Sequence, residues 1–169
     1  MKITRKIIID KSATEVWDVL GRNFEQADQW MASVPKSYAK VVGTTAEGAP
    51  LIGRICELSQ KPNGPIADET ITHYDESQFV MHVNVVPRNG NLPIQQNNVV
   101  MSVRPIGDAQ AEVSWASDLE LKPVGKLLYP IVKVGVAKSF DELLEELKHF
   151  VETGTPHPRK VAKLAKLAA

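Results

Sequence analysis

The sequence predicts one α+β domain, in which an antiparallel sheet of about seven strands is covered by a long C-terminal helix. Residues 37–121 hold six β-branched runs separated by turn clusters of Gly, Pro and Asn, which is typical of a strand meander. Residues 130–153 then repeat apolar side chains at helical spacing. A chain of 169 residues and 18.6 kDa is long enough for one domain with a full core.

The N-terminal segment predicts the remaining strand and two short helices. Residues 3–9 are rich in Ile and also contain Thr and Arg in alternation, which indicates a strand. Ser12 and Glu15 have the spacing of a capping box, so a helix is expected to begin there. A second short helix begins at Asn23 and runs toward Trp30.

The C-terminal helix is expected to cross the whole sheet, because 24 residues at 1.5 Å each span roughly 35 Å. Gly154 is placed to end it. Gly135, in its middle, costs about 1 kcal/mol relative to Ala, so we expect a close backbone approach or room for a ligand there. The apolar stripe comprises Val132, Val136, Phe140, Leu143, Leu147 and Phe150.

The domain is expected to cover residues 1–154, and residues 155–169 form a basic tail without acidic residues. Such a tail is a solvated end with helical propensity, or it is held against its own domain or a second copy, which would give a homodimer. Its apolar face is small for firm membrane insertion.

Composition excludes several classes of partner. The 20 basic and 20 acidic residues balance, which argues against nucleic acid. No apolar run is long enough to span a membrane, so no integral membrane contact is expected. A single cysteine, Cys56, fits a reducing, cytoplasmic location. The four histidines lack metal-ligand spacing, and familiar catalytic motifs are absent, so we expect neither metal nor cofactor.

Polar residues on one predicted strand face are the candidates for chemistry. Alternation places Glu69, Ile71 and His73 on the same side of a strand, and Arg54 lies on the preceding strand. A buried Arg and a carboxylate on adjacent strands are expected to pair, because a lone buried charge is costly. The pair is either purely structural or also contacts a ligand. His73 is either a histidine of the core or rim, or a general base.

Apolar residues of the same sheet face predict the wall of a cavity below the helix. Met81, Val83 and Met101 alternate inward, and methionine suits an adaptable wall. Trp115 and Tyr129 are large enough to line such a space. The candidate catalytic residues are His73 and Glu69. The candidate ligand-binding residues are Arg54, Glu69, Ile71, His73, Met81, Val83, Met101, Trp115, Tyr129 and Val136.

The order of elements resembles the helix-grip fold of the START and Bet v 1-like (SRPBCC) superfamily, in particular its polyketide cyclase/dehydrase and lipid-transport branch. The segments that carry the resemblance are Ile8 to Asp10, Ser12 to Trp17, Gly53-Arg54, Asp68 to Ile71, Leu92-Pro93, Val113 to Trp115, and Leu128 to Pro130. The resemblance implies a seven-stranded curved antiparallel sheet wrapped around the long helix. It also implies a cavity for hydrophobic small molecules, with Arg54 and Glu69 in or near it and loops 60–65 and 87–96 at its entrance.

Three functions follow from these features. The first is binding or transport of a hydrophobic small molecule that is lipid-, polyketide- or quinone-like, with no reaction. The alternative is a cyclase/dehydrase-type enzyme, in which His73 acts as base and Glu69 or Arg54 polarises an enolate. The third is a protein-interaction module with a filled core, for which the volume of the cavity is decisive.

Overall fold

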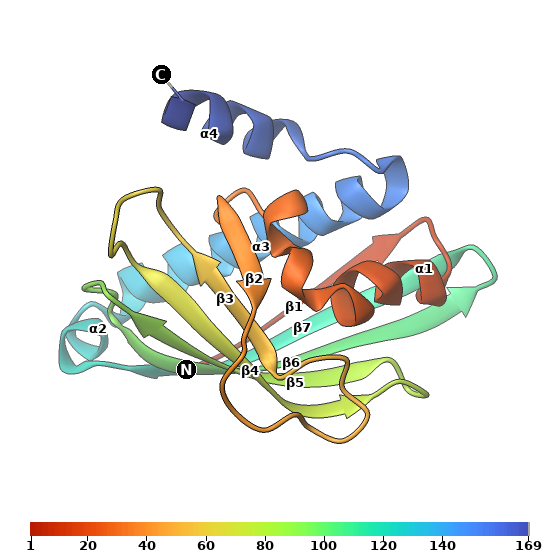
Figure 1. Ribbon diagram of the computed structural model, residues 1–169, viewed down its shortest axis with the longest axis horizontal. Helices are drawn as coiled ribbons and strands as arrows, with labels where there is room; N and C mark the ends of the chain where they lie inside the picture. The colour runs from red at the N-terminus through yellow and green to blue at the C-terminus, as the bar shows by residue number, and fades with distance from the viewer. Residues whose placement is uncertain (169) are drawn as a thin grey trace.

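The computed structural model describes residues 1–168, and the side chains of residues 1–166 (Figure 1). Seven strands form one antiparallel sheet in the order β1-β7-β6-β5-β4-β3-β2. Each strand from β2 onward pairs with the next one in the chain, and β1 joins β7, so only one connection leaves the meander. The strands are β1 (Lys2–Ile9), β2 (Lys36–Ala39), β3 (Gly53–Glu57), β4 (Ile66–Asp75), β5 (Val80–Arg88), β6 (Ile94–Gly107) and β7 (Gln110–Leu121).

The long helix α3 (Tyr129–Thr153) runs across the sheet, which confirms the helix-grip fold (Figure 1). Two short helical segments follow β1, as expected: α1 (Ala13–Trp17) continues into a π-helical turn η1 (Asp18–Arg22), and a 3₁₀ helix η2 (Phe24–Gln29) comes next. A short helix α2 (Pro123–Leu127) precedes α3. Beyond α3, the chain forms α4 (Pro158–Ala168), which turns back and lies outside α3 (Figure 1).

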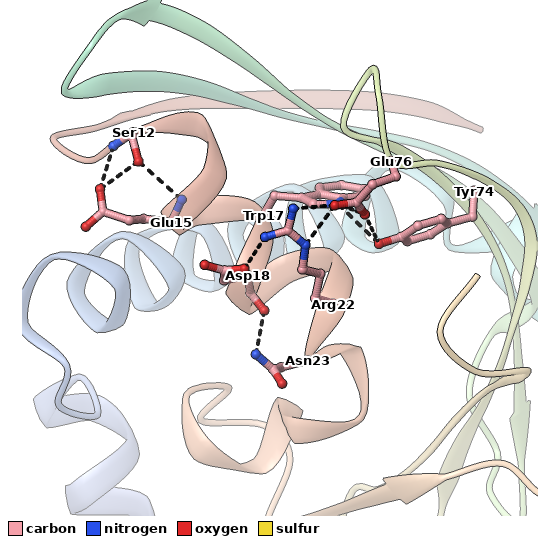
Figure 2. Close-up of polar contacts among 8 residues, drawn as sticks. All are labelled: Ser12, Glu15, Trp17, Asp18, Arg22, Asn23, Tyr74 and Glu76. Carbon is pink, nitrogen blue, oxygen red and sulfur yellow. Dashed lines mark hydrogen bonds and ion pairs between the residues drawn. The ribbon is translucent and has the colours of Figure 1, made fainter. Parts of the chain in front are cut away.

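The helix ends show the local chemistry that the sequence predicts. The backbone N–H of Glu15 donates to Ser12 Oγ at 3.3 Å, and the Ser12 N–H donates to Glu15 Oε2 at 3.0 Å, so the capping box is confirmed (Figure 2). The Ser12 hydroxyl also donates to Glu15, and this bond is the main reason that the Glu15 pKa falls to about 2. Gly154 ends α3 in the left-handed conformation at φ 71°.

Burial along α3 is uneven. Leu144 and Leu147, in its C-terminal half, are buried in the main core. Near its start, Ile131 and Val134 are exposed. The expectation of a close backbone approach at Gly135 was wrong, because a Cβ atom at this position would meet no atom within 4 Å. Room for a ligand there stays a prediction, and Gly135 is not among the residues that line the cavity between the sheet and α3.

The polar network at the β4–β5 turn joins α1 and η1 to the sheet. The Trp17 indole N–H donates to the Tyr74 hydroxyl at 3.2 Å and to Glu76 Oε2 at 2.9 Å (Figure 2). Arg22 donates to the other Glu76 oxygen and pairs with Asp18. Burial alone would raise the Glu76 pKa, but hydrogen bonds from Tyr74, Trp17 and Arg22 outweigh it and lower the pKa. These groups satisfy one another, which is typical of a structural network.

Candidate functional site

A cavity of about 140 Å³ lies between the inner face of the sheet and α3, partly open to the surface. Its inner wall is built from side chains that alternate along β3, β4, β5, β6 and β7, because every second residue of a strand points to the same face. The lining residues are Met31, Ser33, Val34, Arg54, Cys56, Leu58, Ala67, Glu69, Val83, Val85, Asn97, Val99, Met101, Trp115, Phe140 and Leu143.

Arg54 and Glu69 face each other directly across β3 and β4. Arg54 Nε and Nη2 both lie 2.9 Å from Glu69 Oε2, and Arg54 Nη1 donates to the backbone oxygen of Phe24 at 2.7 Å. The guanidinium also lies 3.9 Å from the centre of the Phe24 ring. Only 2% of Arg54 and 8% of Glu69 is exposed. The expected cross-strand pair is therefore confirmed, and its contact with a ligand stays a prediction.

Gly53 permits the close approach of β3 and β4 that forms this pair. A Cβ atom on Gly53 would lie 2.0 Å from the backbone oxygen of Glu69, which no side chain tolerates. The glycine therefore keeps the two strands in register next to Arg54.

Two polar side-chain atoms of the cavity wall are buried without a hydrogen-bond partner among the described residues: Asn97 Oδ1 and Trp115 Nε1. One accepts and the other donates hydrogen bonds. Asn97 is 9% exposed and Trp115 is 5% exposed. The Asn97 amide nitrogen is 3.4 Å from Ser117 Oγ, so the side chain is held from one side. Leaving such groups unpaired costs about 1–3 kcal/mol each.

Cys56 also lines the cavity, but as a protonated thiol. Burial raises its pKa to about 12. Its sulfur lies 3.6 Å from Ser37 Oγ. At neutral pH this side chain is therefore a small, weakly polar part of the wall and not a thiolate nucleophile.

The loop at residues 31–34 completes the wall and is fixed by α3 and α4. Glu146 of α3 accepts a hydrogen bond from the Ala32 N–H at 2.8 Å. Lys160 of α4 donates to the backbone oxygens of Met31 at 2.9 Å and Val34 at 3.0 Å. Arg159 bonds the same Glu146 carboxylate at 2.9 Å. The tail is thus held against its own domain, and Lys160 is only 2% exposed.

Half of the predicted ligand-binding residues line the cavity: Arg54, Glu69, Val83, Met101 and Trp115. The other five lie elsewhere. Ile71 and Met81 are buried in the core beyond the cavity, and Val136 packs on a second cluster with Ile3, Leu119 and Leu121. Tyr129 is 42% exposed at the start of α3.

The prediction that His73 faces the cavity was wrong, and the cause is a bulge in β4. A bulge shifts the β4–β5 register between Ile71, which pairs with Val83, and His73, which pairs with His82. The extra residue, Thr72, reverses the alternation, so Tyr74 is buried on the inner face and His73 is exposed on the outer face. The His73 ring then lies 4.8 Å from the His82 ring on the outer face of the sheet.

The sequence did contain a signal for some residues that the prediction missed. Cys56 follows Arg54 at an interval of two, and Val85 follows Val83 in the same way. Asn97 and Val99 precede Met101 at this interval on β6. Extending each alternation by one or two steps would have included them. The loop residues Met31, Ser33 and Val34 carried no such periodic signal.

A curved sheet that grips a long helix over an apolar cavity defines a START-like ligand-binding domain. The chain belongs to the polyketide cyclase / dehydrase and lipid transport family, whose model matches residues 1–152. A comparison with curated protein sequences finds no significant match. Among the helices of residues 1–168, none combines the length and apolar composition needed to cross a membrane.

Solved structures share the fold at low sequence identity. A START superfamily protein from Mycobacterium smegmatis superposes with a TM-score of 0.71 at 15% identity, covering 91% of this chain and 99% of that one. A solution structure from Thermobifida fusca gives 0.66 at 18%, covering 92% and 97%. Norcoclaurine synthase from Thalictrum flavum, in complex with dopamine and hydroxybenzaldehyde, gives 0.61 at 16%, covering 89% and 86%. Such identities establish a common fold only.

Proposed function

We propose that the protein binds a small, mostly apolar molecule that carries a hydrogen-bonding group, in the cavity between the sheet and α3. The aliphatic and aromatic walls supply the affinity, at roughly 25 cal/mol for each Å² of apolar surface removed from water. A few polar groups among such walls orient a ligand. The cavity contains both parts, because Arg54, Glu69, Asn97 and Trp115 lie among apolar neighbours.

The observation that carries the proposal is the pair of unpartnered polar atoms. Buried polar groups in folded proteins are almost always hydrogen-bonded. Asn97 Oδ1 and Trp115 Nε1 lack a partner in the described structure, and both residues line the same cavity. A ligand hydroxyl donates to the first or accepts from the second once a small shift of the neighbouring side chains admits it. Binding then removes a cost that the protein carries without the ligand.

The cavity volume supports a ring-sized ligand. An apolar cavity of about 150 Å³ accommodates benzene, and this one has about 140 Å³. A second hollow of about 370 Å³ lies beneath α4 and shares Ser33, Phe140 and Leu143 with the cavity. Longer lipid- or polyketide-like molecules therefore require these shared side chains to move, so that the ligand extends into the second hollow.

The other two functions have less support. The enzymatic hypothesis relied on His73 as base, and His73 lies on the outer face. Among the titratable groups described in the cavity wall, Glu69 is paired with Arg54 and Cys56 remains protonated. An interaction module with a filled core does not fit the open volume beside unpartnered polar atoms. A cytoplasmic location stays part of the proposal.

Isothermal titration calorimetry with phenol and toluene tests the proposed binding. Phenol has a hydroxyl group where toluene has a methyl group, so the comparison isolates the hydrogen-bonding group. We expect phenol to bind about 3- to 10-fold more tightly, the ratio that one net hydrogen bond gives. Asn97→Leu should reduce this preference. Ala67→Phe fills the cavity and should abolish binding of both, whereas Ala116→Phe, the same change on the outer face of β7, should leave binding intact.

Equal affinity for phenol and toluene would contradict the role of the polar atoms. Unchanged phenol binding by the folded Ala67→Phe variant would place the site elsewhere.

A further inference from the structure

The molecule has an exposed apolar surface at the end where α2 meets α3. We call it the α2–α3 shoulder. It lies at the end of α3 opposite to the connection with α4 (Figure 1). It consists of the side chains of Val124, Leu127, Leu128, Tyr129, Ile131 and Val134.

The exposed apolar residues at the start of α3 contrast with the buried ones in its C-terminal half. Leu127 is 82% exposed, and Ile131 and Val134 are each 71% exposed. Leu144 and Leu147, farther along α3, are buried. Scattered exposed apolar residues are ordinary, but six of them lie within residues 124–134, and such a concentration indicates an interaction surface.

Every charged side chain of residues 121–140 is basic, and this segment lies between the acidic residues Glu120 and Asp141. It contains four lysines. Lys138 pairs with Glu142 at 3.8 Å. Lys122, Lys126 and Lys133 form no ion pair within the part of the chain that the structure describes.

We propose that the α2–α3 shoulder docks on an anionic membrane surface, as a peripheral contact that does not cross the bilayer. Apolar side chains on one face, with lysines beside them, match the interfacial region of a bilayer with acidic lipid head groups. Tyr129 adds an amphipathic ring of the kind that lies at this interface. The three unpaired lysines favour contact with a negatively charged surface.

A second copy of this chain is a poorer occupant. In a two-fold symmetric dimer the shoulder would face itself, so the lysines of one subunit would lie against those of the other. Such like-charge contacts oppose association.

The C-terminal helix α4 is the rival location for membrane contact, because it is also basic and amphipathic. However, Arg159 and Lys160 are occupied by contacts inside the molecule. Among the α4 side chains that the structure describes, the large exposed apolar residues are Val161 at 55% and Leu164 at 38%, two against the six of the shoulder. We therefore place the membrane contact at the α2–α3 shoulder and not at α4.

Co-sedimentation of the full chain with vesicles tests it, using phosphatidylcholine alone and phosphatidylcholine mixed with phosphatidylglycerol. We expect binding to the anionic vesicles, little to the neutral ones, and weaker binding at high salt. Lys126→Ser with Lys133→Ser should weaken binding by about 30-fold, at the usual contribution of a lysine near an anionic surface. Leu127→Ser with Ile131→Ser should abolish binding to the anionic vesicles.

Matched controls separate this surface from others. Val41→Ser with Val42→Ser removes two apolar residues that are 87% and 76% exposed on a loop, and should leave binding unchanged. Val161→Ser with Lys163→Ser on α4 should do the same. The proposal is overturned if the anionic vesicles fail to bind the protein, if the α4 variant alone loses binding, or if light scattering shows a dimer that Leu127→Ser with Ile131→Ser dissociates.

Discussion

Breaking the Arg54–Glu69 pair should destabilise the protein strongly, and removing both charges together should cost much less than the sum of the two single changes. Glu69→Gln leaves the Arg54 charge in a site where 2% of the residue is exposed. Arg54→Met leaves the Glu69 charge and also removes the contacts with Phe24. Each single change should lower the free energy of unfolding by about 3–5 kcal/mol, as for other broken buried ion pairs.

The double variant buries no charge. Its free energy of unfolding is lowered only by the missing hydrogen bond to Phe24 and the missing cation–π contact. Together these amount to about 2–3 kcal/mol. The coupling energy between the two positions should therefore be about 3 kcal/mol or more. Urea unfolding of the four proteins measures it, because a domain of this size has roughly 5–15 kcal/mol of stability to lose.

A surface pair supplies the matched control. Arg5 Nε and Asp141 Oδ1 are 2.6 Å apart, closer than the buried pair, yet their side chains are 35% and 52% exposed. The cycle with Arg5→Met and Asp141→Asn should give at most about 1 kcal/mol. Additive effects at Arg54 and Glu69, within about 0.5 kcal/mol, would refute the idea that burial makes this pair important.

Three further changes test the fold and its response to pH. Leu147→Ala should lower stability by about 2–5 kcal/mol, whereas Leu127→Ala, at an exposed position, should change it by less than about 0.5; equal midpoint shifts in urea would contradict the burial along α3. Gly135→Ala should raise stability by about 1 kcal/mol, and a loss would reveal an unseen contact. The Glu76 pKa is lowered from 4.5 in the folded protein, so its contribution is present above pH 4.5 and is lost as the pH falls through the folded pKa; Glu76→Gln should flatten this part of the stability profile, and an unchanged acid limb would contradict the assignment.

The sequence predicted the architecture well, because the two-residue alternation of strands and the helical spacing of apolar residues identify the main elements. Alternating strands, the capping box at Ser12 and the glycine at position 154 are local signals that tertiary contacts do not override. The pairing of Arg54 with Glu69 followed from alternation on two adjacent strands and the cost of a lone buried charge.

The details of the site were less accessible. The bulge at Thr72 inserts one residue in a β-branched run that has no Gly or Pro to mark it, and so His73 was assigned to the wrong face. The position of the cavity along the sheet depends on sheet curvature and on how α3 packs, which no local pattern records. Lys160 lies in a basic stretch that looks solvated, but two backbone oxygens from a distant loop bind its ammonium group.

Native mass spectrometry of the protein purified from its own host shows most directly whether the cavity between the sheet and α3 holds a ligand. The native protein and Ala116→Phe should both carry an additional mass from a bound apolar molecule. The same mass should be missing from Ala67→Phe, in which the cavity is filled. A native protein without any bound mass, or an equal bound mass in both variants, would contradict the claim that this cavity holds the ligand.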